Sequence, residues 1–417
     1  MNKNNILIIT NEFLPYTRSL GGILRMLTLS EFLSKNNYSV HVLTSKSYHK
    51  KIEDYQNILE NISLHYVNNY KNYSKVRRKK LKSNFTFNVL NILRVLFYNF
   101  YHSLICFGFD QARINLKKYK IQSAQIIEKY KIKHVIISSP PFSLFLISKY
   151  LKKKKLNIKI IHDYRDSWTL RFNSNHLLKK IATKYIENNT VNFVDNITCA
   201  SNDIKNKILD NLSIKEKKNI IVIFNGYINY DKNINIKKFQ KTSTIKIGYF
   251  GMITDNPNGY RDLNIIYKNI NKEVENKFKF IFYGPHNIKS KKILNYKSFK
   301  FNKSIDHQSA ILKMNEMDYL LLIHSEKETA SEVLTTKLFD YIFTKKPIIV
   351  ISNGETEAGQ LIEKYKIGKN INLQHLPLSD TLLEIINTDN FNQLNEMQYN
   401  YFSRENQNLK FLQILND

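Results

Sequence analysis

Two acidic residues, Glu332 and Asp340, enclose a segment whose composition suits a phosphate-bearing ligand. They lie eight positions apart, so a helix that contained both would place them on one face, a little over two turns apart. The helix start, expected at 333–336, would offer unpaired backbone N–H groups, which favour bound phosphate. Carboxylates that accept hydrogen bonds from sugar hydroxyls, beside such a helix start, suit a nucleotide-sugar. The alternative is an ordinary amphipathic helix before the apolar run 347–351.

A second group of polar residues follows an apolar run earlier in the chain. Its seven residues, from His162 to Trp168, include one histidine, two acids, one arginine and the only tryptophan. Loops at strand ends carry function disproportionately, which makes this group a candidate site. The structural alternative is an ion pair between Arg165 and a carboxylate. Asp163 and Asp166 could mimic a metal-binding pair, but we expect no bound metal.

Glycines mark three places where the backbone must turn or come close to a partner. Gly21 and Gly22 separate the first expected strand from the first helix, where small residues let a backbone approach phosphate or substrate. They do not match the GxGxxG pattern, so a dinucleotide site is weakly supported and a plain turn is the alternative. Gly251 ends a later strand, and Asn225-Gly226 fits a tight turn at a domain junction.

Strands and helices alternate along the chain, which is typical of doubly wound α/β domains with parallel sheets. A helix is expected at 24–33. Ligands of such sheets bind beyond the carboxyl ends of the strands. The expected strands are residues 6–10, 39–45, 134–141, 158–164, 196–201, 244–251, 278–284, 319–325 and 346–352.

The pattern divides into two similar halves. We expect an N-terminal domain at 1–225, a polar linker at 226–243 and a C-terminal domain at 244–395. A final helix at 396–417 is expected to pack back on the N-terminal domain. Two such domains would enclose a cleft, the default ligand site.

The charge of the chain is strongly positive: 64 Lys and Arg residues against 35 Asp and Glu residues give +29. Such a balance suggests a polyanionic partner, which could be nucleic acid, an anionic membrane or a phosphorylated substrate. The two cysteines, Cys106 and Cys199, are too few for a disulfide framework. The N-terminal residues resemble a first strand rather than a signal peptide, so we expect a cytoplasmic enzyme.

Seven segments occur in a characteristic order: ILIITNEFLPYTRSLGGILR, SSPPFSLFLISKYL, IIHDYRDSW, ITCASNDI, IFNGY, GYFG and TTKLFDYIFTKKPII. In this order they resemble bacterial glycosyltransferases of family 4, from about residue 5 to the C-terminus, with 46–115 poorly covered. The resemblance implies the GT-B fold, in which two Rossmann-like domains face a cleft. It also implies retaining transfer without a metal, in the synthesis of capsule, O-antigen or a related glycan. The N-terminal domain would bind the acceptor and the C-terminal domain the nucleotide-sugar.

The resemblance also implies roles for residues near the donor. Glu332 matches the first acid of the family's E-x7-E motif, which contacts hydroxyls of the donor sugar. Asp340 matches the second, which holds the ribose, and is one methylene shorter than the family's glutamate. His162 lies near a histidine that contacts the donor in many members. Gly21 and Gly22 would line the cleft.

The diphosphate of the donor needs helix N–H groups and a cation. Thr335, Thr336 and Lys337 lie where the helix start would meet it. Many members carry a basic residue after the glycine that corresponds to Gly251, but this chain has Met252 there. The candidate replacements are Lys337 again and Arg261, and the sequence does not choose between them.

The poorly matching region contains a basic cluster and a long apolar segment. Residues 75–82 hold six basic side chains, and apolar positions recur at helical spacing through 85–109. Such a pair suits the interface of an anionic leaflet, where a lipid-linked saccharide acceptor would lie. We therefore expect a peripheral protein of the inner membrane face. The alternative is a helical hairpin packed on the N-terminal domain, to whose basic face 152–155 could belong.

Two further classes of function stay open. A nucleotide-sugar 2-epimerase with the GT-B fold would act on the donor alone, without an acceptor. A nucleic-acid-binding protein would use the positive charge, but the basic residues are spread over the chain and no known binding motif occurs. The sequence therefore favours a glycosyltransferase without a nucleic-acid partner.

Overall fold

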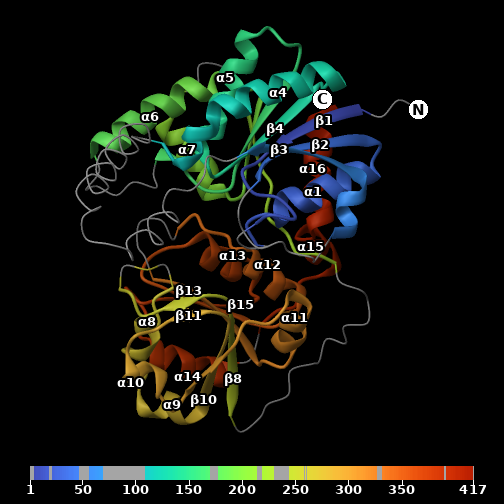
Figure 1. Ribbon diagram of the computed structural model, residues 1–417. Helices are drawn as coiled ribbons and strands as arrows, with labels where there is room; N and C mark the ends of the chain where they lie inside the picture. The colour runs from blue at the N-terminus through green and yellow to red at the C-terminus, as the bar shows by residue number, and fades with distance from the viewer. Residues whose placement is uncertain are drawn as a thin grey trace, which may run out of the picture. The chain divides into compact units, whose positions relative to one another are not determined.

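The chain folds around two parallel β-sheets, each covered by helices (Figure 1). The computed structural model describes residues 4–17, 21–46, 56–68, 109–169, 177–213, 218–229, 244–257, 259, 261–325, 331–388 and 391–416. Two units result, which are described separately. The first comprises Met1–Ala200, Ile204–Ile223 and Phe411–Asp417, and the second comprises Ser201–Asp203 and Phe224–Lys410.

The sheet of the first unit has seven strands in the order β3-β2-β1-β4-β5-β6-β7. All neighbouring pairs are parallel. Apolar side chains of its central strands are fully buried, as expected for a sheet with both faces covered. The strands are β1 (Asn4–Ile9), β2 (Tyr38–Lys46), β3 (Ile62–Asn68), β4 (His134–Ser139), β5 (Lys159–Tyr164), β6 (Asn196–Cys199) and β7 (Asn219–Val222).

Helices connect these strands. The C-cap of α4 is Lys131, which adopts a left-handed conformation with φ 51°. The described helical segments are α1 (Leu24–Lys35), η1 (Gln56–Asn61), η3 (Gln111–Asn115), α4 (Leu116–Tyr130), η4 (Phe142–Phe145), α5 (Leu146–Lys153), α6 (Leu177–Val191) and α7 (Asn202–Asn211).

The sheet of the second unit has six strands in the order β12-β10-β8-β13-β14-β15, again all parallel. They are β8 (Ile245–Phe250), β10 (Phe278–Tyr283), β12 (Phe299–Asn302), β13 (Tyr319–His324), β14 (Ile348–Ser352) and β15 (Gly368–Asn372). A small second sheet pairs β9 (Ile253–Thr254) with β11 (His286–Asn287).

The helices of the second unit precede or follow these strands in the alternating pattern. They are α8 (Asn264–Tyr267), α9 (Lys272–Lys277), α10 (Lys291–Leu294), α11 (His307–Asn315), α12 (Thr336–Phe343), α13 (Glu357–Tyr365), α14 (Leu378–Thr388), α15 (Glu396–Tyr401) and α16 (Arg404–Asn416). The last turns of α16 belong to the first unit.

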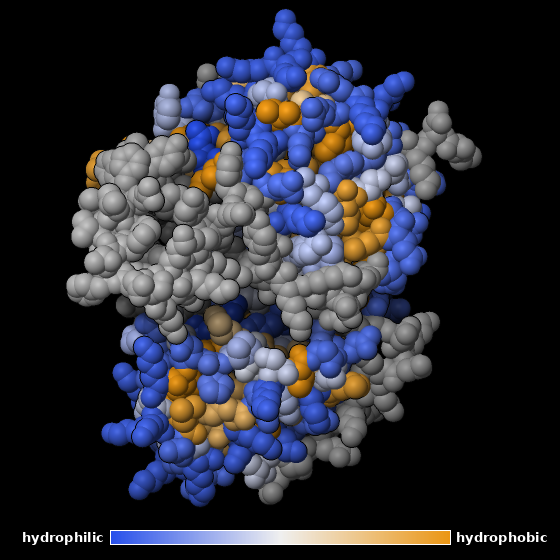
Figure 2. Space-filling model, in the orientation of Figure 1, coloured by the Kyte–Doolittle hydropathy of each residue, from blue (hydrophilic) through white to orange (hydrophobic). Residues whose placement is uncertain are grey.

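The expected doubly wound α/β architecture is confirmed, and every expected strand overlaps an observed one. Six strands, β3, β7, β9, β11, β12 and β15, were not expected. Most of the expected linker, 230–243, and most of the basic and apolar segment, 75–108, lie outside the described residues. Within the described part, no helix is both long and apolar enough to cross a bilayer. Figure 2 shows a largely hydrophilic face with separate hydrophobic patches.

Candidate functional site

The start of α12 carries polar groups without internal partners. Thr335 is its N-cap, in extended backbone with φ −68° and ψ 154°, but its side chain makes no capping bond. Its Oγ1 is buried and has no hydrogen-bond partner among the described residues. The N–H of Leu338 already donates to the carbonyl of Thr335 at 3.1 Å, whereas the N–H groups of Thr336 and Lys337 precede the first possible partner within the helix. Since Thr336 and Lys337 follow in that turn, the helix start is suited to an anion.

Lys337 brings a half-buried amine to this helix start. Its Nζ lies 3.0 Å from the hydroxyl of Tyr249 and 4.5 Å from the centre of that ring. Burial, followed by the nearby charge of Arg261, lowers the pKa of Lys337 well below its usual value. An anion placed here would oppose both effects and favour the charged amine.

Gly251 leaves room for the lysine. Its φ is +138°, which L side chains rarely adopt, and a Cβ there would lie only 2.5 Å from Nζ of Lys337. Gly251 directly follows β8, at the carboxyl edge of the sheet. Gly251, which is predicted to contact the donor, therefore lies directly beside Lys337, one of the two candidate cations for the diphosphate.

Arg261 is held near the same edge. The backbone N–H of its neighbour Asp262 donates to Oγ of Ser325, 2.8 Å away, and that hydroxyl donates to the carbonyl of Gly259. Arg261 is close enough to lower the pKa of His324, whose value falls to about 4 through burial first and then the charges of Arg261 and Lys337. At neutral pH His324 is thus uncharged.

The described residues place no acid within ion-pair distance of either cation. Neither Arg261 nor Lys337 forms an ion pair within 4 Å in the described part of the chain, although Asp340 favours the charged form of Lys337. Met252, at the position where many family members are basic, is exposed. Both candidates for the missing cation therefore lie in one electrostatic environment, which the sequence alone did not show.

The two acids of the predicted motif occupy different kinds of backbone. Asp340 lies within α12, nearly buried, and its Oδ2 is 3.1 Å from Nε2 of His307. Glu332 lies in the loop before α12, with its carbonyl accepting from the N–H of Leu334 at 3.1 Å. The expectation that one helix face carries both acids is therefore wrong, because the helix begins only at Thr336. Glu332 is nevertheless buried close to that helix start in the chain.

In the first unit, the strongest polar network centres on Asp163. Arg25 of α1 donates to both of its carboxylate oxygens, at 2.7–3.1 Å, while Ser138 and Thr198 donate to it at 2.8 Å each. Burial acts to raise the pKa of Asp163, but Arg25 and the hydroxyl donors together hold it below its usual value. Arg25 also donates to the carbonyl of Ile223 at 2.7 Å.

Sequence reasoning missed Arg25. The only available signal was a single arginine within the apolar first turns of an expected helix, where a charge needs a buried partner. The network uses Asp163 entirely as a structural acid. No group of three or more His, Cys, Asp or Glu side chains suited to a metal occurs within the described residues.

His162 is buried inside the sheet of the first unit. It lies in β5, fully inaccessible, and its ring stacks on Phe145 with centroids 3.9 Å apart. Neither ring nitrogen has a hydrogen-bond partner among the described residues. Burial, with a smaller contribution from Lys218, lowers its pKa well below the usual value. These features suit a neutral core side chain, and a contact with a donor stays a prediction.

The other residues of the polar group have mainly backbone or core partners. Arg165 donates to the carbonyls of Gly22 and Pro140, so it holds the loop that contains Gly21 and Gly22. The expected alternative of an Arg165 ion pair within 4 Å does not occur in the described chain. Trp168 is buried and stacks on a phenylalanine of η4.

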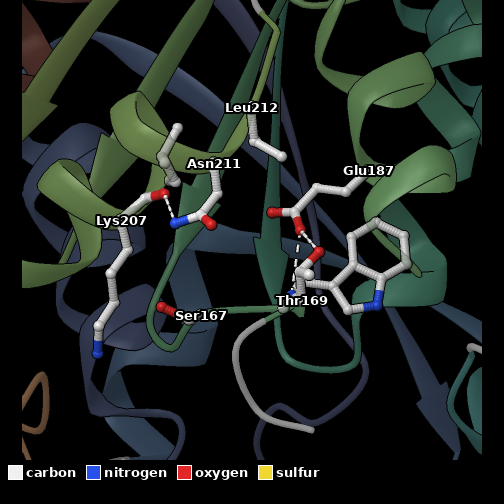
Figure 3. Close-up of a pocket in the computed structure, with 8 residues that line it drawn as sticks. Ser167, Thr169, Glu187, Lys207, Asn211 and Leu212 are labelled. Atoms are coloured by element: carbon white, nitrogen blue, oxygen red, sulfur yellow. Dashed lines mark hydrogen bonds between the residues drawn. The ribbon is translucent and has the colours of Figure 1, made fainter. Parts of the chain in front are cut away.

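A small pocket lies beside residues 167–169, between α6 and α7 (Figure 3). Its acid, Glu187, accepts from the backbone N–H of Thr169 at 3.1 Å and also from the Thr169 hydroxyl. Lys207 and Asn211 line the pocket from α7, and Asn211 donates back to the Lys207 carbonyl. Since Glu187 and the Asn211 amide already have partners within the first unit, the pocket offers less to a charged ligand than the start of α12.

Comparison with known proteins gives matches in structure but not in sequence. No protein-family model matches the chain, and no curated protein matches it. A glycosyltransferase from Rickettsia africae ESF-5 has a TM-score of 0.63 at 16% identity, over 99% of this chain and 98% of that one. Sucrose-phosphate synthase from Thermosynechococcus elongatus has a TM-score of 0.66 at 10% identity, over 99% and 98%.

HepE from Anabaena, solved in complex with UDP-glucose, has a TM-score of 0.59 at 12% identity, over 99% of both chains. These likenesses extend over essentially the whole chain and show its fold. The chain has the two-domain GT-B fold, as the resemblance in sequence implied.

Proposed function

We propose that this chain is a retaining glycosyltransferase, similar to family 4, that uses a nucleotide-diphospho-sugar. The observation that carries the proposal is the start of α12, where a Thr335 hydroxyl without a partner among the described residues and the backbone N–H groups of Thr336 and Lys337 occur beside the half-buried Lys337 amine. A diphosphate would supply the acceptors and the negative charge that these groups lack. The GT-B fold of the solved glycosyltransferases supports the same conclusion.

Each residue of the site has a role in this reaction. The N–H groups of Thr335 and Thr336, with Lys337 and Arg261, would stabilise the nucleoside diphosphate as it leaves, which is the main electrostatic task of the transfer. Preorganised donors are effective here because they need no rearrangement when charge develops. A leaving-group oxygen would take the proton of the acceptor hydroxyl.

The two acids would divide the recognition of the donor. Glu332 would accept hydrogen bonds from hydroxyls of the sugar, and Asp340 from the ribose. HepE binds UDP-glucose in its solved structure, so UDP-glucose is the first donor to test.

The acceptor in this proposal is a saccharide, linked to a lipid of the inner membrane leaflet, in the synthesis of capsule, O-antigen or a related glycan. The chain would be cytoplasmic and peripheral to that leaflet. This part of the proposal is supported by the charge of the chain and by the sequence of 75–109, which lies almost entirely outside the described residues.

Calorimetry with nucleotides tests the proposal directly. We expect nucleoside diphosphates to bind more tightly than the corresponding monophosphates, because the second phosphate reaches α12. Lys337→Met should weaken the diphosphate at least about tenfold, or 1.4 kcal/mol, and change the monophosphate much less. Lys345→Met is the matched control, because Lys345 lies beyond the other end of α12 and contacts Tyr399.

Equal binding of mono- and diphosphates by the wild type would contradict the proposed site. Donor turnover then separates the reaction classes. A 2-epimerase would convert the donor without an acceptor, whereas a glycosyltransferase requires one.

A further inference from the structure

The helix α6 of the first unit presents apolar side chains to solvent. Leu177, Leu178, Ile181 and Tyr185 are 62%, 74%, 57% and 70% exposed, respectively. Hydrophobic atoms are visible at the left edge of Figure 2, where α6 lies in Figure 1. Isolated exposed leucines are common on proteins, but a contiguous apolar stripe usually marks an interaction site.

The exposed apolar side chains of α6 lie on one side of the helix. Successive residues of a helix are about 100° apart, so the four exposed side chains fall within a sector of roughly 100°. The side of the helix that faces the protein is largely polar: Thr183, Glu187 and Thr190 are buried there, together with the apolar Val191 and the partly buried Ile186. A helix stabilised only by its own domain would turn the apolar stripe inward.

Basic side chains accompany the apolar stripe. Lys180 and Lys184 lie at one border of the stripe, and Lys179 precedes them in the first turn. The neighbouring helix α5 packs against α6 and is followed by the exposed Lys154 and Lys155. The one acid of α6, Glu187, is buried and bonded to Thr169, so it does not offset this charge.

We propose that α6 binds the surface of an anionic membrane leaflet, with Leu177, Leu178, Ile181 and Tyr185 inserted at the boundary between headgroups and acyl chains. Interfacial helices combine such an apolar face with lysines that attract anionic lipid, and tyrosine favours this depth. The stripe supplies the apolar part and its lysines the electrostatic part. The inference deepens the proposed function, since it gives the peripheral enzyme a membrane-binding surface within the described first unit.

Vesicle flotation with the full-length protein tests this surface. We expect binding to vesicles that contain phosphatidylglycerol, and much less to vesicles of phosphatidylcholine alone. Leu178→Asp combined with Ile181→Asp should lower the partition coefficient at least about tenfold, because both acids would enter the interface. Lys180→Ser combined with Lys184→Ser should lower it mainly at low salt, since screening weakens that part.

A matched control is Met397→Asp in the second unit, because Met397 is 82% exposed on α15. It should float like the wild type. The altered side chains on α6 are exposed or, for Lys180, half-buried, so the melting temperatures of the α6 variants should also stay close to that of the wild type. A fluorescent reporter adds a direct readout: in the Tyr185→Trp variant, brominated lipid should quench the fluorescence of the new side chain.

Unchanged flotation of the Leu178→Asp, Ile181→Asp variant would overturn the proposal. A wild-type dimer that the same variant converts to a monomer, without vesicle binding by either, would instead make the stripe a contact between copies. Nucleotide calorimetry keeps the two proposals apart. If the Leu178→Asp, Ile181→Asp variant loses vesicle binding but keeps normal affinity for the nucleoside diphosphate, the change affects the membrane surface of α6 alone. If the wild type binds vesicles but no nucleotide, the result contradicts the proposed function and leaves the membrane surface in place.

Discussion

Nε2 of His307 lies 3.1 Å from Oδ2 of Asp340, so the first residue of α11 contacts an acid of α12. Both side chains are largely buried, at 21% and 9% exposure. The other oxygen of Asp340 makes no hydrogen bond to the described residues. The histidine therefore fixes the orientation of the short acid and leaves one carboxylate oxygen for a ligand hydroxyl.

This contact leads to a prediction about which part of the donor Asp340 recognises. Asp340→Ala should weaken both the nucleoside diphosphate and the full donor, by about tenfold or more, because the ribose contact is common to both. Calorimetry with the nucleoside diphosphate and its 2′-deoxy analogue measures the effect. His307→Phe should reduce the preference for the ribose form, since it frees the carboxylate to rotate.

Identical affinities of Asp340→Ala and wild type for the nucleoside diphosphate would remove Asp340 from the ribose site. Glu363→Ala on α13 is a suitable control, because Glu363 is an exposed helical acid of the same unit.

Glu332 should matter for the sugar and for turnover. Glu332→Gln keeps the size of the side chain but removes its charge and changes its hydrogen bonds to the donor hydroxyls. We expect transfer to fall at least about tenfold, which is about 1.4 kcal/mol of transition-state stabilisation. Steady-state kinetics with saturating acceptor measures this. Normal turnover in a variant with an unchanged melting temperature would exclude the role.

The neutral buried histidines predict a loss of stability in acid. The pKa of His324 falls to about 4 through burial and then the charges of Arg261 and Lys337, so only the unfolded chain binds this proton between pH 6.5 and 4. Its contribution is complete above pH 6.5 and is lost as the pH falls toward 4, by up to about 1.4 kcal/mol per pH unit.

Urea unfolding at pH 7, 6 and 5 measures this loss. His324→Gln should flatten the dependence without abolishing it, because burial and the nearby His65 also lower the pKa of His41 to about 4. An unchanged pH dependence in His324→Gln would show that the site does not keep this histidine neutral.

His162 should stabilise the first unit as an aromatic side chain. His162→Ala removes the ring that stacks on Phe145 and should lower the free energy of unfolding by about 3 kcal/mol. His162→Phe should retain the stability, since neither ring nitrogen is used by a described residue. Thermal unfolding of both variants compares these effects.

Turnover of His162→Phe then decides whether the histidine also contacts the donor. Normal activity would leave it with a structural role alone. A large loss of activity at normal stability would restore the role that the resemblance implied.

Much of the fold could be predicted because buried parallel strands appear as short apolar runs. The run before Glu332 and the run after Asp340 became β13 and β14. The start of α12 was less certain, because 333–335 could continue a helix by composition alone. The extended backbone of Thr335 delays the helix to Thr336 and excludes Glu332 from it.

Contacts between distant residues could not be predicted in the same way. Arg25 and Asp163 are 138 positions apart, and His307 and Asp340 are 33 apart. Periodicity within one element gives no register between two elements, so neither pair was visible in the sequence. The same holds for Lys337 and Gly251, whose contact depends on the backbone angle of the glycine.

The division of the first unit into separate chain segments has a consequence for its synthesis. Phe411, Ile414 and Leu415 of α16 are buried in or near its core, Asn416 accepts from the hydroxyl of Tyr38 at 3.2 Å, and Phe411 lies 5.5 Å from the Arg25 guanidinium. Domains usually fold in order as the ribosome releases them. Here the first unit becomes complete only after α16 emerges, so a truncation that removes α16 damages the part of the protein that is made earlier.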